Sequence, residues 1–305
     1  MGYASSQVEN AYATCRRLAR RHYENFPVAS HLVPRDKRDA LAAIYAFARC
    51  ADDFADEGWG QVAGVPTPEV RLRQLSDWRQ QLGDCYLGSA DHPVFVALGD
   101  AARRFQLSRQ HFEDLLRAFE LDVRVNRHEN FSALLAYCSC SANPVGRLVL
   151  ELFGHRDAER VGLSDSICTA LQLTNFWQDV ALDLERNRVY VPMEDMARFE
   201  YSLDDLRAAR ADTRWRRLLA FELGRTREMF ERGRRLAERV TPSLRLQLRM
   251  TWLGGMKILE KIENAEYDVF RRRPSLGSWG FLRLLVRAWR LRSNADELRE
   301  PQALG

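Results

Sequence analysis

The chain has 305 residues, of which 46% are hydrophobic and 29% are charged. This composition is typical of a globular protein with a large core, and it excludes the disordered and fibrous classes. The net charge is only +4, although nearly all the basic residues are Arg, which suits bidentate contacts with phosphate or carboxylate groups. A basic face lying on anionic lipid and a simple genomic bias towards Arg are both compatible with this excess.

Along nearly the whole chain, apolar residues recur at three- and four-residue spacing, which predicts helices and almost no strands. The helices are expected at residues 8–23, 36–57, 68–87, 93–104, 108–122, 131–153, 157–184, 203–210, 213–239, 242–270 and 278–291. One loop, at 58–68, is rich in Gly and Pro, but no linker or short repeat divides the chain. We therefore predict a single all-α domain, residues 1–305, of about ten helices.

The cysteines and the N-terminus indicate the cellular compartment. None of the six cysteines has a C-x-x-C or zinc-type spacing. So few cysteines in a chain of this length indicate reduced thiols in a cytoplasmic protein. The N-terminus lacks the apolar segment of a secretory signal, and no stretch approaches the roughly 20 apolar residues needed to span a bilayer. We expect a soluble or peripheral protein.

Two segments place carboxylates four residues apart among large apolar residues. In the first, "YAFARCADDFADE", Asp52 and Asp56 share a narrow stripe of a helix with Tyr45 and Arg49, because each residue advances about 100° around the helix axis. Asp53 falls to one side of that stripe. The helix can therefore present two carboxylates and one guanidinium towards a common point.

The second segment, "NFWQDVALDLE", places Asn175, Asp179 and Asp183 at successive four-residue steps. Two carboxylates one turn apart repel each other, and the repulsion grows when the site is buried. A cation must compensate for it, and hard oxygen ligands of this kind suit Mg²⁺, which completes its shell with water and substrate phosphate. Two facing helices could hold Mg²⁺ ions around a diphosphate. Solvated helix faces are the alternative, and the residue pattern alone leaves both open.

Four motifs, in order along the chain, resemble those of one enzyme family. They are "YAFARCADDFADE", "YCSCSANPVG", "LQLTNFWQDVALDLERNRVYVP" and "ILEKIENAEYDVF". On these motifs the sequence is identified as a member of the squalene/phytoene synthase family, with a match from about Tyr12 to Arg273. The resemblance implies the all-α isoprenoid synthase fold, in which the helices surround a central active-site cavity.

The resemblance also implies roles for individual residues. The metal ligands would be Asp52, Asp56, Asn175, Asp179 and Asp183. The substrate-binding residues would be Arg49, Tyr45, Gln178 and Tyr267. The catalytic residues would be Tyr137, Arg49 and Tyr45. Gly254 and Gly255 lie inside an expected helix at a cost of about 1 kcal/mol each. Close approach of another helix or room for substrate would explain this cost, and we favour room for substrate.

Within the family, "ARRHYENFPVASHLVP", "SANPVGR" and "TNFWQDV" resemble the hydroxysqualene-forming branch of bacterial hopanoid biosynthesis. This resemblance implies that presqualene diphosphate and water become hydroxysqualene and diphosphate, with several Mg²⁺ ions and without NADPH. Gln178 stands where squalene and phytoene synthases usually carry Arg, which fits an enzyme that handles one diphosphate.

The expected partners are a prenyl diphosphate lipid, the inner membrane surface by peripheral contact, and a presqualene diphosphate synthase that hands over the substrate. No nucleic acid is expected. Four alternatives remain open. Two are enzymes: a squalene synthase and a synthase that condenses two prenyl diphosphates. The other two are an inactive relative acting as an assembly factor and a helical Mg²⁺ or Ca²⁺ binder without catalysis. The sequence assigns no role to the basic run of Arg271, Arg272 and Arg273.

Overall fold

The computed structural model describes residues 4–21, 33–56, 66–271 and 273–276. Regular structure in these residues is helical, apart from an isolated parallel bridge between Arg127 and Val189, which confirms the all-α prediction. The helices are α1 (Ser5–Arg21), α3 (Arg35–Asp56), α4 (Pro68–Leu87), α5 (Pro93–Phe105), α6 (Arg109–Arg124), α7 (Phe131–Ser141), α8 (Asn143–Leu152), α9 (Ala158–Gln178), α10 (Val180–Glu185), α11 (Met193–Arg198), α12 (Leu203–Arg207), α13 (Thr213–Gly233), the 3-10 helix η2 (Arg234–Glu238) and α14 (Pro242–Asn264). The helix expected at 278–291 lies outside the described residues.

Two long helices expected from the sequence are interrupted. The stretch 131–153 forms α7 and α8, which meet at Ala142, because Pro144 has no N–H to continue a helix and instead lies in the first turn of a new one. The stretch 157–184 breaks at Asp179, whose ψ of 14° departs from the helical value. Both breaks lie inside the family motifs, where apolar periodicity continues across them.

Three smaller differences concern helix ends and one short element. The stretch 213–239 finishes as the 3-10 helix η2, and the stretch 242–270 ends as a helix at Asn264. Helix α11 has only six residues, which is too short to produce a readable apolar period.

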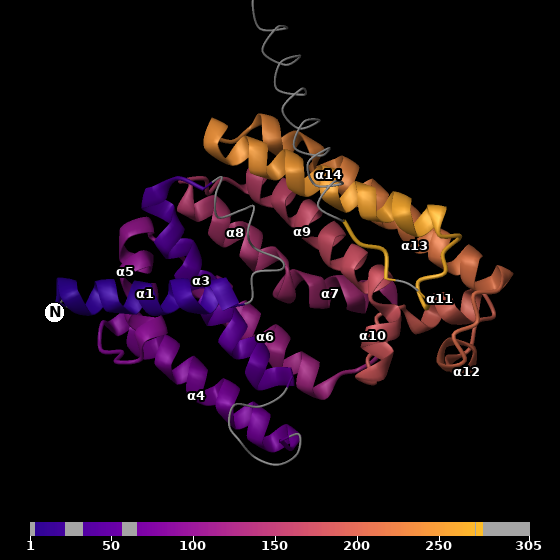
Figure 1. Ribbon diagram of the computed structural model, residues 1–305, viewed down its shortest axis with the longest axis horizontal. Helices are drawn as coiled ribbons and strands as arrows, with labels where there is room; N and C mark the ends of the chain where they lie inside the picture. Colours follow the sequence, from indigo (N-terminus) through magenta and orange to yellow (C-terminus); the bar gives the residue numbers. More distant parts are fainter. Residues whose placement is uncertain (1–3, 22–32, 57–65, 272, 277–305) are drawn as a thin grey trace, which may run out of the picture.

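Buried apolar side chains form two large cores. One is built mainly by α1, α3, α4, α5 and α6 around the rings of Phe47, Trp78 and Phe95, and the other by α7, α9, α13 and α14 around Trp177 and Trp215. Figure 1 shows these two groups on opposite sides of the molecule, with α8 between them. Since α3 belongs to one core and α9 to the other, the two acidic segments are anchored in separate halves of the fold.

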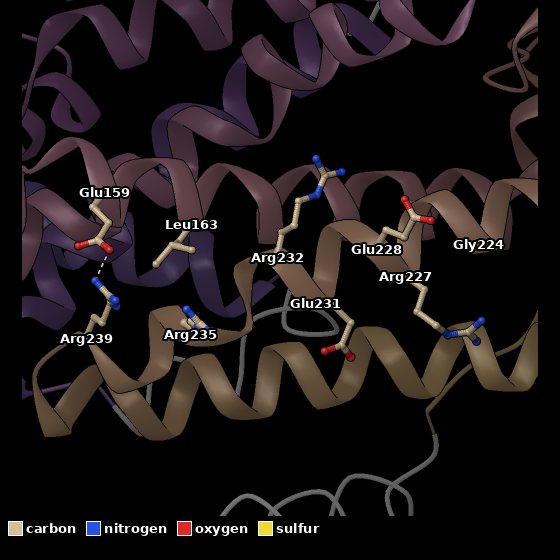
Figure 2. Close-up of a pocket in the computed structure, with 9 residues that line it drawn as sticks. All are labelled: Glu159, Leu163, Gly224, Arg227, Glu228, Glu231, Arg232, Arg235 and Arg239. Atoms are coloured by element: carbon tan, nitrogen blue, oxygen red, sulfur yellow. Dashed lines mark hydrogen bonds and ion pairs between the residues drawn. The ribbon is translucent and has the colours of Figure 1, made fainter.

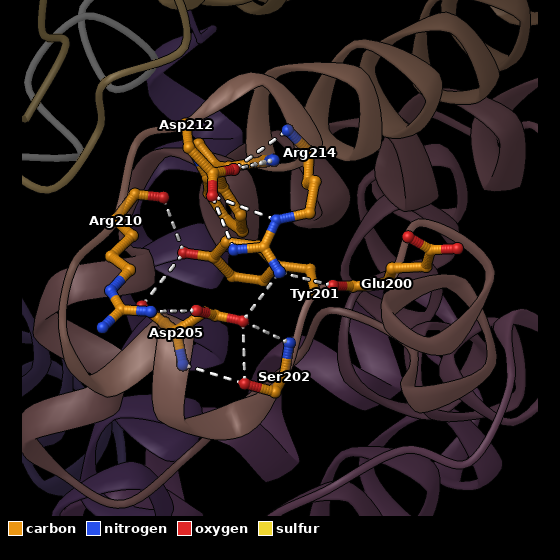
Figure 3. A network of polar contacts seen from close by, with 8 residues as sticks. Glu200, Tyr201, Ser202, Asp205, Arg210, Asp212 and Arg214 are labelled. Atoms are coloured by element: carbon orange, nitrogen blue, oxygen red, sulfur yellow. Dashed lines mark hydrogen bonds and ion pairs between the residues drawn. The ribbon is translucent and has the colours of Figure 1, made fainter.

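The turn between α12 and α13 is fixed by a polar network (Figure 3). The Tyr201 hydroxyl donates to the carbonyl oxygens of Asp205 (3.2 Å) and Arg210 (2.9 Å). The Arg214 guanidinium donates to the carboxylates of Asp205 (3.2 Å) and Asp212 (2.6 Å). Asp212 also caps α13 by accepting backbone N–H groups of its first turn. The network sets the start of α13, the helix against which α9 packs most extensively.

The adjacent glycines of α14 have different surroundings. A Cβ on Gly255 would overlap the ring of Phe230, a fully buried residue of α13, whereas a Cβ on Gly254 would meet only the Leu276 Cδ1 at 3.7 Å. Close packing of α13 and α14, rather than room for substrate, therefore explains Gly255. For Gly255 this corrects the interpretation favoured from the sequence, and for Gly254 that interpretation stays a prediction.

The two glycines provide a matched pair for a stability measurement. Gly255→Ala is expected to lower the free energy of unfolding by about 1–3 kcal/mol, because the added methyl group overpacks the α13–α14 contact. Gly254→Ala is expected to be neutral or to stabilise by up to about 1 kcal/mol through helix propensity. Thermal melting of both variants checks the difference, and equal melting temperatures would contradict it.

Candidate active site

A cavity of about 290 Å³ lies between the two halves of the fold. It is lined by Arg49, Asp52, Asp56, Asp122, Tyr137, Gln172, Asn175, Phe176, Asp179, Asp183, Arg186, Arg188 and Tyr190. The fold thus brings the acidic face of α3 and the acidic face of α9 and α10 to one place. All the residues predicted as metal ligands, together with Arg49 and Tyr137, line this cavity.

On α3, the carboxylates are paired with arginines. Arg49 Nη1 lies 3.1 Å from Asp52 Oδ2, and the same guanidinium also pairs with Asp53. Asp56 accepts from Arg188 Nη2 at 2.6 Å and from Arg186 Nη1 at 3.1 Å. Because both arginines follow α10, these pairs join α3 directly to the segment that carries the second acidic motif.

On the other side, Asp179 is the hinge between α9 and α10. Its N–H still donates to the carbonyl of Asn175 (2.8 Å), and its own carbonyl accepts from the N–H of Asp183 (2.8 Å). The carboxylates of Asp179 and Asp183 therefore stay one turn apart although the helix breaks between them. Arg273, from the segment after α14, pairs with Asp179 through two N–H groups, one of them at 3.0 Å.

The cavity disfavours the charged form of several carboxyl groups. Burial, with the neighbouring Asp56, raises the pKa of Asp52 to about 6. Burial, with the neighbouring Asp179, raises the pKa of Asp183 to about 7. Burial also raises the pKa of Asp122 to about 6. When these carboxylates are all ionised, they repel one another, and the repulsion favours the binding of cations in the cavity.

The raised pKa of Asp183 makes the stability of the metal-free protein depend on pH. A carboxyl whose pKa rises from 3.8 to about 7 on folding stabilises the fold while protonated, and that contribution is lost as the pH rises from about 4 through 7. Asp183→Asn is therefore expected to match the wild type near pH 4 and to melt about 2 °C higher, or more, at pH 8. Melting both proteins in EDTA checks this, and a melting difference independent of pH would contradict it.

The donor set fits a hard divalent cation. The four carboxylates of the two acidic motifs and the Asn175 amide face one cavity, and these oxygen groups are the protein ligands that Mg²⁺ takes. In the part of the chain that the structure describes, no three acidic, His or Cys side chains converge to hold one ion by themselves. Mg²⁺ usually takes one or two carboxylates and fills its remaining positions with water and phosphate oxygens, so the donor set remains suitable.

An aromatic wall closes the inner side of the cavity. The Phe176 and Tyr190 rings stack with centroids 3.8 Å apart, and the buried Tyr137 ring packs beside both, 6.1 Å from Phe176 and 5.9 Å from Tyr190. The Tyr137 hydroxyl donates to Asp122 Oδ1 at 2.7 Å. Burial raises the pKa of Tyr137 well above its usual range, so its hydroxyl stays protonated and Asp122 is the proton-accepting member of the pair.

Three residues predicted to bind substrate lie elsewhere. Gln178 is buried and does not line the cavity, and its side-chain amide donates to the carbonyl of Pro274. Tyr267 follows α14 with a φ of 64°, and its carbonyl accepts from the Trp215 indole N–H (2.8 Å). Tyr45 lies on α3 one turn before Arg49, half-buried, and outside the set of cavity-lining residues. Their roles stay predictions.

Several cavity residues were missed by the sequence reasoning. Asp122, Arg186, Arg188 and Tyr190 line the cavity, yet none was assigned a role. Arg188 and Tyr190 belong to the R-x-Y-x-P end of the second acidic motif, so that end was the available signal. Asp122 lies on α6, whose apolar pattern is that of an ordinary packed helix, so the sequence gives no signal for it. Only the hydrogen bond from Tyr137 in the structure identifies Asp122 as a site residue.

Cavity size alone does not identify this site. A larger groove, of about 1010 Å³, lies along α9, α13 and η2. Figure 2 shows the side chains that line it. It is lined by Glu159, Leu163, Gly224, Arg227, Glu228, Glu231, Arg232, Arg235 and Arg239. None of these residues was predicted to act, and acidic and basic side chains alternate there, with Arg239 paired to Glu159. The smaller cavity is the one in which carboxylates of two separate elements converge.

The sequence matches the family model described as squalene/phytoene synthase over residues 19–280. The chain belongs to the squalene/phytoene synthase family. Phytoene synthase from Arthrospira platensis is 32% identical to this chain over 287 residues, covering 88% of this chain and 89% of that protein. The 15-cis-phytoene synthase of Synechococcus elongatus is 30% identical over 288 residues, covering 90% of this chain and 91% of that protein.

Solved structures agree with this membership of the squalene/phytoene synthase family. Squalene synthase HpnC from Alicyclobacillus acidocaldarius superposes with a TM-score of 0.80 and 39% identity, covering 87% of this chain and 97% of that one. A dehydrosqualene synthase with a bound ligand superposes with a TM-score of 0.84 and 24% identity, covering 95% and 99%. The second likeness concerns the fold alone, and both confirm the isoprenoid synthase fold that the resemblance implied.

Proposed function

We propose that this enzyme of the squalene/phytoene synthase family converts presqualene diphosphate and water to hydroxysqualene and diphosphate. The observation that carries the proposal is the cavity in which both acidic motifs, three arginines and an aromatic wall meet. The 39% identity to a squalene synthase HpnC, higher than the 30–32% identity to phytoene synthases, supports the hopanoid-type branch over the phytoene-type branch.

The diphosphate would bind at the polar end of the cavity. Arg49, Arg186 and Arg188 line that end, and guanidinium groups form charge-assisted bonds with phosphate oxygens. Mg²⁺ ions held by Asp52, Asp56, Asp179 and Asp183, with Asn175 assisting, would neutralise the charge of the leaving diphosphate. The carbon–oxygen bond of the substrate breaks, and the bonding electrons leave with the diphosphate.

The hydrocarbon cation that remains would lie against the aromatic wall. The ring faces of Phe176, Tyr190 and Tyr137 stabilise a cation and exclude stray nucleophiles while it rearranges. One water then forms a new carbon–oxygen bond and releases a proton. Asp122, whose pKa of about 6 makes it a base at neutral pH, accepts that proton through the Tyr137 hydroxyl.

A second candidate is the condensation of two prenyl diphosphates, as the names of the phytoene synthase relatives indicate. Incubation with Mg²⁺ and either presqualene diphosphate or farnesyl diphosphate, followed by mass spectrometry, separates the two. The proposal expects an alcohol product from presqualene diphosphate that carries heavy oxygen in H₂¹⁸O and is unchanged by NADPH. Squalene as the main product with NADPH, or consumption of farnesyl diphosphate alone, overturns it. Release of no diphosphate from any substrate favours an inactive assembly factor.

We further propose that the enzyme works in the cytoplasm, in peripheral contact with the inner membrane, and receives its substrate from a presqualene diphosphate synthase. The lipid nature of the substrate supports this. No helix in the described residues is long and apolar enough to cross a bilayer. Co-sedimentation with anionic vesicles is expected at low salt and is expected to weaken as salt screens the attraction. Absence of binding at low salt would exclude the membrane contact.

A further inference from the structure

Residues 273–275, which follow α14, are held beside the cavity by several contacts. Arg273 pairs with Asp179 through two N–H groups, and the next residue, Pro274, accepts a hydrogen bond from the buried Gln178 side chain. Lys261 Nζ donates to the carbonyl of Ser275 at 2.7 Å. The position of the Arg273 guanidinium is therefore set by contacts to both α9 and α14.

The pair between Arg273 and Asp179 occupies both oxygens of the carboxylate. Nε of Arg273 faces Oδ1, and Nη2 lies 3.0 Å from Oδ2. Asp179 belongs to the acidic pair proposed to hold Mg²⁺. A cation that binds Asp179 must compete with the guanidinium for these oxygens, because two positive charges on one carboxylate repel each other.

We propose that Arg273, positioned by Gln178, is a built-in competitor of the divalent cation at Asp179, and that it makes binding of the cation depend on an incoming diphosphate. This inference rests on the metal site of the proposed function. A diphosphate supplies new anionic oxygens for the displaced guanidinium and further oxygen ligands for the cation. The cation alone supplies neither, so it must compete with the arginine unaided.

The coupling must be reciprocal. If the diphosphate strengthens cation binding by some factor, the cation strengthens diphosphate binding by the same factor. The device would keep the acidic cavity neutralised in the resting enzyme, and it would prevent the cation from occupying Asp179 before a substrate is present. Removal of the competing arginine should therefore raise the affinity for the cation alone and reduce the coupling.

The test measures Mn²⁺ binding to the full chain by electron paramagnetic resonance, with and without inorganic diphosphate. Mn²⁺ accepts the same oxygen ligands as Mg²⁺. In Arg273→Gln, binding of Mn²⁺ alone is expected to tighten by about two- to fivefold, the range of a half-exposed ion pair, while binding with diphosphate does not tighten. Gln178→Leu is expected to change Mn²⁺ binding in the same direction and by less, because it loosens the segment without removing the charge.

Arg271→Gln is the matched control. Arg271 lies two residues away, is 90% exposed, and pairs with Asp268 at 3.4 Å outside the cavity. If Arg273→Gln binds Mn²⁺ alone no better than Arg271→Gln, while both bind it normally with diphosphate, the competition is refuted and the metal site stands. If the wild type binds no Mn²⁺ even with diphosphate, the metal site and the inference both fail. Circular dichroism verifies that each variant is folded.

Discussion

Replacing Asp52 by Asn is expected to lower turnover of the proposed substrate, presqualene diphosphate, by about 10³-fold or more, because a proposed cation ligand is lost where the charge of the leaving diphosphate would develop. The amide has the shape of the carboxylate and removes its repulsion from Asp56, so the melting temperature should stay the same or rise. Arg49 keeps its pair with Asp53. Asp179→Asn is expected to cause a similar loss of turnover.

Asp53→Asn is the matched control for this prediction. It lies next to Asp52 on α3 and pairs with the same arginine, but it does not line the cavity. Its turnover is expected to remain within about tenfold of the wild type. EDTA should stop the wild type, and Mg²⁺ should restore it. If Asp52→Asn retains most of its activity in a preparation whose melting temperature shows that it is folded, Asp52 is not a metal ligand.

The second large effect is expected at the Tyr137–Asp122 pair. Tyr137→Phe and Asp122→Asn should each lower kcat by about 10²–10⁴-fold, the range for loss of a positioned proton acceptor. Because the two side chains act as one unit, the double variant should be little worse than either single variant. Steady-state kinetics of the wild type, the two single variants and the double variant with presqualene diphosphate measures this double-mutant cycle.

A tyrosine–aspartate pair outside the site serves as the control. Tyr12 donates to Asp100 at 2.8 Å between α1 and α5, in the other core. Tyr12→Phe is expected to lower the free energy of unfolding by about 1 kcal/mol without changing kcat. If the losses of kcat in the Tyr137 and Asp122 variants are strictly additive, the two residues act separately. If the variants change only the melting temperature and not kcat, the pair only supports the fold.

The sequence by itself determined the helical class, the family and the two acidic faces. The family followed from the resemblance of four motifs. The helical class and the acidic faces depend on local periodicity, since four-residue spacing places Asp52 with Asp56, and Asp179 with Asp183, on one side of a helix wherever that helix packs. The position of most helices follows for the same reason, because caps and apolar stripes are properties of neighbouring residues. The breaks at Ala142 and Asp179 were missed, since the apolar period continues through both.

Only the tertiary structure decided which charges meet. Arg188 reaches Asp56 and Tyr137 reaches Asp122 because helices of the two cores converge on one cavity. Arg273 reaches Asp179 because the segment after α14 packs against the end of α9 within the second core. It also turned Gln178 away from that cavity and onto Pro274, and placed the Phe230 ring where a side chain at Gly255 would lie. Such contacts depend on packing between distant segments, and nothing in the spacing of neighbouring residues encodes the partner of a given side chain.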